Sequence, residues 1–124
     1  MKATELRIGN YVYYHGTNGP THNIYKIDGI DISLMESKKG YLKLHTPIQL
    51  TEQWVKDFEY VIEFQDEDSN NVFKLGNLKV VIKKEVIYFG IWNVPFEKFK
   101  KKIKYVHQLQ NLYFVLTEKE LTKQ

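Results

Sequence analysis

The chain has 124 residues, of which 43% are hydrophobic and 27% are charged, values that are ordinary for one globular domain. The absence of cysteine excludes disulfides, thiol catalysis and thiolate metal sites, and it is compatible with a reducing cytoplasm. No apolar run approaches the roughly 18 residues of a membrane-spanning helix, and residues 1–5 lack the apolar stretch of a signal peptide. We therefore expect a single cytoplasmic domain over residues 1–124.

The net charge of +3 is mild, but it is unevenly distributed along the chain. Residues 1–62 carry seven basic and seven acidic side chains, whereas residues 63–124 carry eleven basic and eight acidic ones. The basic excess is concentrated in one lysine segment, namely Lys98, Lys100, Lys101, Lys102 and Lys104. An acidic patch opposes it, namely Glu63, Asp66, Glu67 and Asp68.

Short β-type segments separated by turn formers dominate the first 50 residues. Residues 11–14, 24–27, 30–34 and 41–45 each alternate or are rich in β-branched and aromatic side chains, which predicts four strands. Residues 15–23 are dense in Gly, Asn, Thr and Pro, which predicts a loop. Strands this short and this closely spaced indicate a bent antiparallel sheet or a partial barrel.

The middle of the chain predicts a short helix followed by a second antiparallel β region. Thr51 suits an N-cap, with Glu52 in the first turn, so we expect a helix over residues 51–59. Strands are expected at residues 60–64, 73–75 and 78–82, the last two joined by a tight turn at Gly76 and Asn77. Residues 86–92 are almost continuously apolar, which predicts a central strand buried on both faces.

The C-terminal region predicts a core helix over residues 105–116. Its broad apolar face contains Tyr105, Val106, Leu109, Leu112, Tyr113 and Leu116. A narrow polar stripe lies opposite and contains Lys104, His107, Gln108 and Asn111. The preceding residues 95–104 either extend this helix back to Pro95 or include a strand near 102–105, and we favour a helix that begins near residue 105. The expected fold is α+β.

The sequence contains no convincing catalytic or metal-binding constellation. His15, His22 and His45 lack the spacing of metal ligands, and His107 has only Asn111 as an orienting neighbour, which makes a small hydrolase the least favoured function. The carboxylate pairs Asp28 with Asp31 and Asp66 with Asp68 fall where turn residues are expected. We therefore expect no enzyme, no metal and no cofactor.

The lysine segment is the sharpest local signal. Lysines neutralise phosphates and exposed aromatic rings stack on bases, which makes these lysines candidates for nucleic-acid contact. However, the interleaved Phe96, Phe99, Ile103 and Tyr105 fit helical spacing, so we expect them in the core with the lysines as a solvated face. The leading expectation is a non-enzymatic module that binds another protein or itself, with nucleic-acid binding as the alternative.

Three segments resemble the signatures of a family of small uncharacterised bacterial and prophage proteins. The most specific is the C-terminal motif VHQLQNLYF at residues 106–114, followed by Leu116, Thr117, Glu120 and Leu121. Residues 6–12 (LRIGNYV) and 47–54 (PIQLTEQW) are similar to the other two signatures, in the same order. The resemblance implies one continuous domain in a bacterial cytoplasm or a phage-derived context, and it implies no activity.

Overall fold

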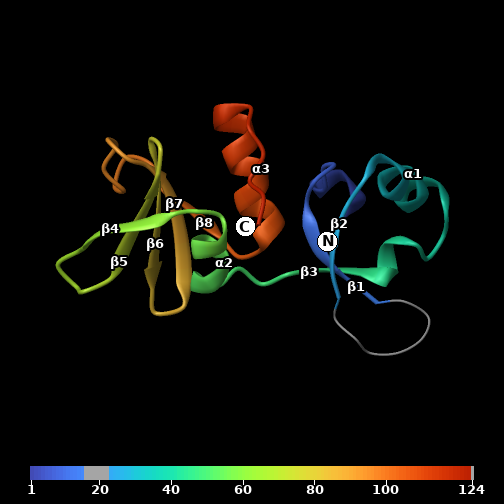
Figure 1. Ribbon diagram of the computed structural model, residues 1–124, viewed down its shortest axis with the longest axis horizontal. Helices are drawn as coiled ribbons and strands as arrows, with labels where there is room; N and C mark the ends of the chain where they lie inside the picture. The colour runs from blue at the N-terminus through green and yellow to red at the C-terminus, as the bar shows by residue number, and fades with distance from the viewer. Residues whose placement is uncertain (16–22, 124) are drawn as a thin grey trace. The chain divides into compact units, whose positions relative to one another are not determined.

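The computed structural model (Figure 1) describes residues 1–15 and 23–123. The chain is α+β, with one three-stranded and one five-stranded antiparallel sheet, and neither sheet closes into a barrel within these residues. It divides into two compact units, each described by itself: unit 1 is Met1–Gln49 with Tyr105–Leu121, and unit 2 is Leu50–Lys104 with Thr122–Gln124. A single domain over residues 1–124 stays a prediction.

Unit 1 contains the three-stranded sheet, in the order β2-β1-β3. Its strands are β1 (Tyr11–Tyr14), β2 (Asn23–Lys26) and β3 (His45–Pro47). Its helical elements are η1 (Ala3–Glu5), α1 (Gly29–Ser37), η2 (Leu42–Leu44) and α3 (Val106–Thr117). A cluster of buried side chains forms a core in this unit, namely Leu6, Val12, Ile27 and Met35.

The strand expected at residues 30–34 is wrong, because this segment belongs to helix α1. Asp28 is the N-cap: its side chain accepts from the Asp31 backbone N–H, and the Asp31 carboxylate accepts from the Asp28 N–H, both at 2.9 Å. This reciprocal capping box fixes the first helical turn. The apolar alternation misled the prediction, since Ile30 is 71% exposed while Asp31 and Met35, one turn apart, are buried.

The strand expected at residues 41–45 is also wrong over most of its length. Leu42–Leu44 forms the short 3-10 helix η2, and only His45 belongs to strand β3. The loop predicted at residues 15–23 lies mostly outside the described residues, which resume at Asn23 in β2.

The expectation of a core helix near the C-terminus is confirmed for the first turns of α3. Val106 and Leu109 are fully buried, but Val115 is 72% and Leu116 is 47% exposed, so the second half leaves the core. The helix is preceded by strand β8 (Lys101–Ile103), so a single helix from Pro95 is excluded and the favoured start near residue 105 is confirmed. No helix of the described residues is long and apolar enough to cross a membrane.

Unit 2 contains helix α2 (Glu52–Asp57) and the five-stranded sheet, in the order β4-β5-β6-β7-β8. The strands before β8 are β4 (Val61–Gln65), β5 (Asn71–Leu75), β6 (Leu78–Lys83) and β7 (Val86–Ile91). Thr51 caps α2 as predicted, accepting from the Trp54 N–H. Gly76, with a φ of +59°, turns β5 into β6, also as predicted. Figure 1 shows the sheet, from β4 to β8, as a meander of neighbouring strands.

Candidate functional site

The alternation of side chains divides the sheet of unit 2 into two different faces. On one face Phe73, Val80 and Phe89 lie opposite one another on β5, β6 and β7, and all three are fully buried. On the other face a row runs across all five strands, namely Phe64, Val72, Val81, Tyr88 and Lys102. The sequence predicted that residues 86–92 form a strand buried on both faces. This prediction is wrong for β7, because Tyr88 on its second face is only half-buried.

This second face carries aromatic rings with lysine ammonium groups over them, and we call it the aromatic–lysine face. The Lys74 Nζ lies 4.5 Å from the centre of the Trp92 ring, and the Phe64 ring meets Trp92 edge-on at 5.9 Å. The Lys100 Nζ lies 4.9 Å from the centre of the Tyr88 ring. Both lysine–ring distances fall within the range of a cation–π contact.

Gly90 allows Phe96 to lie against this face. A Cβ atom on Gly90 would collide with the Phe96 Cε1, so the ring occupies the space that a side chain would take. Lys79 lies over the same ring with its Nζ 4.5 Å from the centre, and it donates a 2.9 Å hydrogen bond to the Val94 carbonyl. Burial lowers the Lys79 pKa, and the negative charge of Glu97 partly opposes this.

A pocket of about 340 Å³ opens on the aromatic–lysine face. Val72 and Val81, both buried, belong to its lining. The remaining lining residues are aromatic or charged, namely Phe64, Trp92, Phe96, Lys79, Lys83, Asp66 and Glu97. Backbone hydrogen bonds from Asn70 lower the Asp66 pKa. The volume falls at the small end of the range for ligand pockets, and the lining combines stacking surfaces with both signs of charge.

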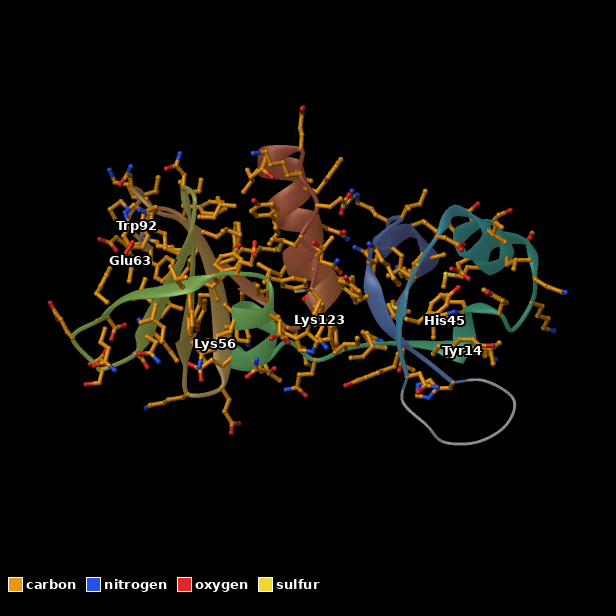
Figure 2. All side chains as sticks on the ribbon, viewed as in Figure 1. Tyr14, His45, Lys56, Glu63, Trp92 and Lys123 are labelled. Atoms are coloured by element: carbon orange, nitrogen blue, oxygen red, sulfur yellow. The ribbon has the colours of Figure 1, made fainter. Side chains whose placement is uncertain are left out.

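Figure 2 shows Glu63 and Trp92 near one another on unit 2. Lys74 connects them, because its Nζ lies over the Trp92 ring and also 4.0 Å from the Glu63 Oε1. A lysine held by both a ring and a carboxylate has a restricted position. Lys74 is therefore an oriented cation on this face rather than a freely moving one.

Strand β8 directs neighbouring side chains of the lysine segment to opposite faces of the sheet. Lys102 is paired with Tyr88, and Lys100 lies over the ring of that tyrosine, so both belong to the aromatic–lysine face. Lys101 is paired with Phe89 on the opposite face, where Ile103 is buried. Lys98 and Lys104 are exposed. The expectation that this segment is the solvated side of a helix is wrong, because residues 101–103 form a strand.

The polar stripe predicted on α3 does not lie on the surface. His107 is 1% exposed, and Gln108 and Asn111 are half-buried. The Gln108 Oε1 accepts from the Tyr105 N–H at 3.0 Å and thereby caps the first turn of the helix. The Asn111 Oδ1 accepts from the Asn10 Nδ2 at 2.9 Å and from the Arg7 guanidinium at 3.3 Å.

Gln110 is fully buried, although the sequence did not single it out. Its Oε1 accepts from the Tyr11 N–H at 2.9 Å, and its Nε2 donates to the carbonyls of Gly9, at 2.9 Å, and Leu121, at 3.1 Å. Arg7 completes the network through Glu120 and lies over the Phe114 ring. The N-terminal and C-terminal motifs therefore meet in one structural network within unit 1.

Asp31 organises a second polar cluster in unit 1. The hydroxyls of Tyr41, at 2.7 Å, and Tyr25, at 3.1 Å, both donate to its Oδ1. Burial favours protonation, but these hydrogen bonds and those from Asp28 outweigh it and lower the Asp31 pKa. The hydrogen bond to Asp31 raises the pKa of Tyr25 to about 12.

The two carboxylate pairs that the sequence singled out have structural contacts. Asp28 and Asp31 cap helix α1. Asp66 accepts turn hydrogen bonds from the backbone N–H groups of Asp68 and Asn70.

The histidines do not gather. His15 hydrogen-bonds the Thr46 hydroxyl, and His107 lies on α3. The His45 ring lies tilted beside the Tyr14 ring, with centroids 5.1 Å apart, and Figure 2 shows these two residues as neighbours. His22 lies outside the described residues. Within residues 1–15 and 23–123 there is no group of three or more His, Asp or Glu side chains arranged to hold a metal ion.

We expect the stability of unit 1 to depend on pH because His107 is buried. Burial lowers its pKa, although the Glu5 carboxylate, 3.8 Å from the Nε2, partly opposes this. The unfolded chain therefore takes up a proton first, near pH 6.5. We expect the free energy of unfolding to fall as the pH drops below about 6.5, down to the folded-state pKa. Amide exchange of α3 at pH 7.5 and pH 5.5 measures this.

The variant His107→Leu provides the control for this prediction. It removes the titrating group, so the loss of stability between the two pH values should shrink. The lowered pKa of Asp31 acts only below about pH 4 and does not enter this range. An equal loss in wild type and variant would show that another group is responsible.

No protein-family model, curated protein or solved structure matches the chain. The aromatic–lysine face therefore rests on geometry alone. Sequence reasoning missed Lys74, Lys79 and Trp92. The predicted tight turn at Gly76 and Asn77 could have revealed the two lysines, because a hairpin with this turn places Lys74 directly opposite Lys79 on neighbouring strands.

Proposed function

We propose that the chain is a non-enzymatic binding protein whose aromatic–lysine face takes single-stranded nucleic acid. The observation that carries the proposal is the row of rings and lysines on one face of an antiparallel sheet, beside a pocket of about 340 Å³. Proteins that bind single strands combine stacking rings with cations that follow the phosphate backbone.

The lysines of this face support the same function, namely Lys74, Lys79, Lys83, Lys100 and Lys102. The carboxylates on or beside the face are Glu63, Asp66, Glu67, Asp68 and Glu97. Lysine contacts phosphate as a point charge and reads no base edges, so binding would be largely independent of sequence. The carboxylates in the pocket accept hydrogen bonds from exocyclic amino groups of a stacked base.

The sequence alone favoured a protein partner because it assigned the aromatic rings to a helix core. That reason no longer holds for Phe96, which lies on the half-open face of the sheet. Tyr88 and Trp92, which the sequence assigned to a strand buried on both faces, lie on the same face. A protein partner remains our second candidate, and the exposed edge strand β4 favours it. From the resemblance we also propose a cytoplasmic, bacterial or phage-derived setting, which the neighbouring genes would test.

The test measures binding of a labelled single-stranded oligonucleotide of about 15 nucleotides by fluorescence anisotropy. We expect affinity to fall linearly with the logarithm of salt concentration. The triple variant Lys83→Gln, Lys100→Gln, Lys102→Gln should lower the magnitude of this slope by about 2, because each phosphate contact to a single strand contributes about 0.7. Trp92→Ala should weaken binding by about 1–3 kcal/mol, the range for one stacked base.

Matched controls use residues outside the face. The variant Lys26→Gln, Lys39→Gln, Lys43→Gln removes the same charge from exposed positions of unit 1 and should keep the wild-type slope. Phe99→Ala removes a ring that does not line the pocket. Equal slopes in both triple variants, or no binding at about 0.05 M salt, would overturn the proposal.

A further inference from the structure

A second pocket adjoins the first one on the side of strand β4. Its volume is about 440 Å³. We call it the outer pocket, and we call the pocket of about 340 Å³ the inner pocket. The two share Phe64, Asp66 and Lys83. The rest of the outer lining comes from the end of β4 and the turn after it, namely Gln65, Glu67 and Asp68. A strand that leaves the inner pocket on this side therefore crosses the outer one.

The outer pocket repels phosphate groups. Among the described residues, its lining holds three carboxylates, Asp66, Glu67 and Asp68, against the single ammonium group of Lys83. Asp66 stays ionised well into the acid range, because the hydrogen bond from the Asn70 backbone N–H lowers its pKa. Like charges brought together across an interface weaken binding and suppress the wrong ligand. A phosphate in the outer pocket would therefore lower the affinity.

The inner pocket suits an uncharged base better than a phosphate. Its lining contains the buried Val72 and Val81 together with three aromatic rings. The charges in this lining balance among the described residues, with two lysines and two carboxylates. One of these lysines, Lys79, already donates a 2.9 Å hydrogen bond to the Val94 carbonyl. A stacked base therefore fits this pocket, and the phosphate attached to it lies outside.

The cations that attract phosphate lie on the other side of the inner pocket. Val81 on β6 is paired with Tyr88 on β7, which is paired with Lys102 on β8. Strand β8 is therefore two strands away from Val81, or about 10 Å. Lys100 lies over the Tyr88 ring, and residues 98–104 contain five lysines and no acidic residue. A phosphate backbone is attracted on the β8 side of the inner pocket and repelled on its β4 side.

We infer that the aromatic–lysine face holds the free end of a single strand, with the terminal base in the inner pocket and the phosphates next to it over β7 and β8. The inference rests on the proposed function and adds the class of ligand, which is a strand end without a terminal phosphate. A base inside a strand has a phosphate on each side, so one of them would have to lie among the carboxylates of the outer pocket. A terminal base has a phosphate on one side only.

The experiment compares unlabelled competitors that displace the labelled oligonucleotide of the previous test, its label placed on an internal base. The competitors share one sequence of about 40 nucleotides, longer than the span that a small fold covers. One is linear with two hydroxyl ends, one is a covalently closed circle, and two are linear with a phosphate on either the 5′ or the 3′ end. We expect the circle to compete about tenfold more weakly than the strand with hydroxyl ends, a difference of about 1.4 kcal/mol. A phosphate should weaken competition by a similar factor at one end only.

The double variant Glu67→Gln, Asp68→Asn tests the cause of this preference. It removes two carboxylates of the outer pocket and keeps Asp66, whose carboxylate holds the turn. The circle should then compete almost as well as the linear strand. The matched control Glu36→Gln, Glu118→Gln removes the same charge from exposed positions of unit 1 and should keep the wild-type ratio.

The outcomes separate this inference from the proposed function. Equal competition by the circle and the linear strand in wild type would overturn the inference and leave single-strand binding intact. The inference is also wrong if neither terminal phosphate has an effect, or if the double variant keeps the wild-type ratio. If the labelled oligonucleotide does not bind at all, the proposed function fails, and this inference fails with it.

Discussion

Replacing Gln110 by leucine is expected to lower the free energy of unfolding of unit 1 by about 2–6 kcal/mol, because the buried carbonyls of Gly9 and Leu121 each lose a partner at about 1–3 kcal/mol. Gln110 is 0% exposed and bonds Tyr11, Gly9 and Leu121. Leucine has nearly the same size but offers no hydrogen bond. Both tryptophans, Trp54 and Trp92, belong to unit 2, so amide hydrogen exchange of α3 is the appropriate measurement.

Gln108→Leu is the matched control for this prediction. It makes the same chemical change two residues earlier on α3, but there it removes the capping hydrogen bond that Gln108 accepts from the Tyr105 N–H. The cost of losing such a cap is about 0.5–2 kcal/mol. If Gln110→Leu cost no more than this control, the buried network would not be what joins the two ends of the chain.

Replacing Leu109 by alanine is expected to cost about 2–5 kcal/mol, the range for truncating a fully buried leucine. Leu109 is 0% exposed on the buried face of α3. Part of this cost is the transfer free energy of the lost atoms, and the remainder is the cavity that the rigid surroundings leave. Denaturant unfolding followed by far-ultraviolet circular dichroism, with amide exchange in α3, measures the change.

Two variants on the same helix calibrate this result. Leu112 is only half-buried, so Leu112→Ala should cost about 1 kcal/mol, less than its position on the predicted apolar face suggested. Val115 is 72% exposed, and Val115→Ala should stay within about 0.5 kcal/mol of wild type. A loss at Leu109 no larger than that at Val115 would place this part of α3 outside the core.

Local signals predicted the elements of unit 2 well. The cap at Thr51 and the turn at Gly76 each depend on a few adjacent residues, and both were found where expected. In unit 1, the start of α3 was predicted correctly because the spacing of apolar residues changes to the helical period near Tyr105. Elements that are defined by their own residues are therefore accessible from sequence.

Helix α1 was missed because two signals in the same residues disagree. Ile30, Ile32 and Leu34 alternate like a strand, whereas the capping pair Asp28 and Asp31 specifies a helix start. The cap is decisive, and the isoleucine at position 30 is left exposed. The two tyrosine hydroxyls that Asp31 accepts add a tertiary contact to this cap, and they hold the Asp31 side of the helix in the interior.

The candidate site was only partly visible in the sequence. The lysine segment was recognised, but its partners on the face come from other strands, and they become neighbours only through the register of the sheet. Phe96 was assigned to a helix because its spacing fits one. Its place over Gly90 depends on the path of the loop after β7, which no local pattern specifies.

The division of the chain has a consequence for the order of events during synthesis. Unit 2 is nearly continuous, from Leu50 to Lys104, whereas unit 1 needs α3, and the bonds of Gln110 to Gly9 and Asn111 to Asn10 span 101 residues. Residues 9 and 10 must therefore wait until α3 has been synthesised before they can form these bonds. The amino-terminal half is then the later of the two to acquire its native contacts, the reverse of the usual vectorial order.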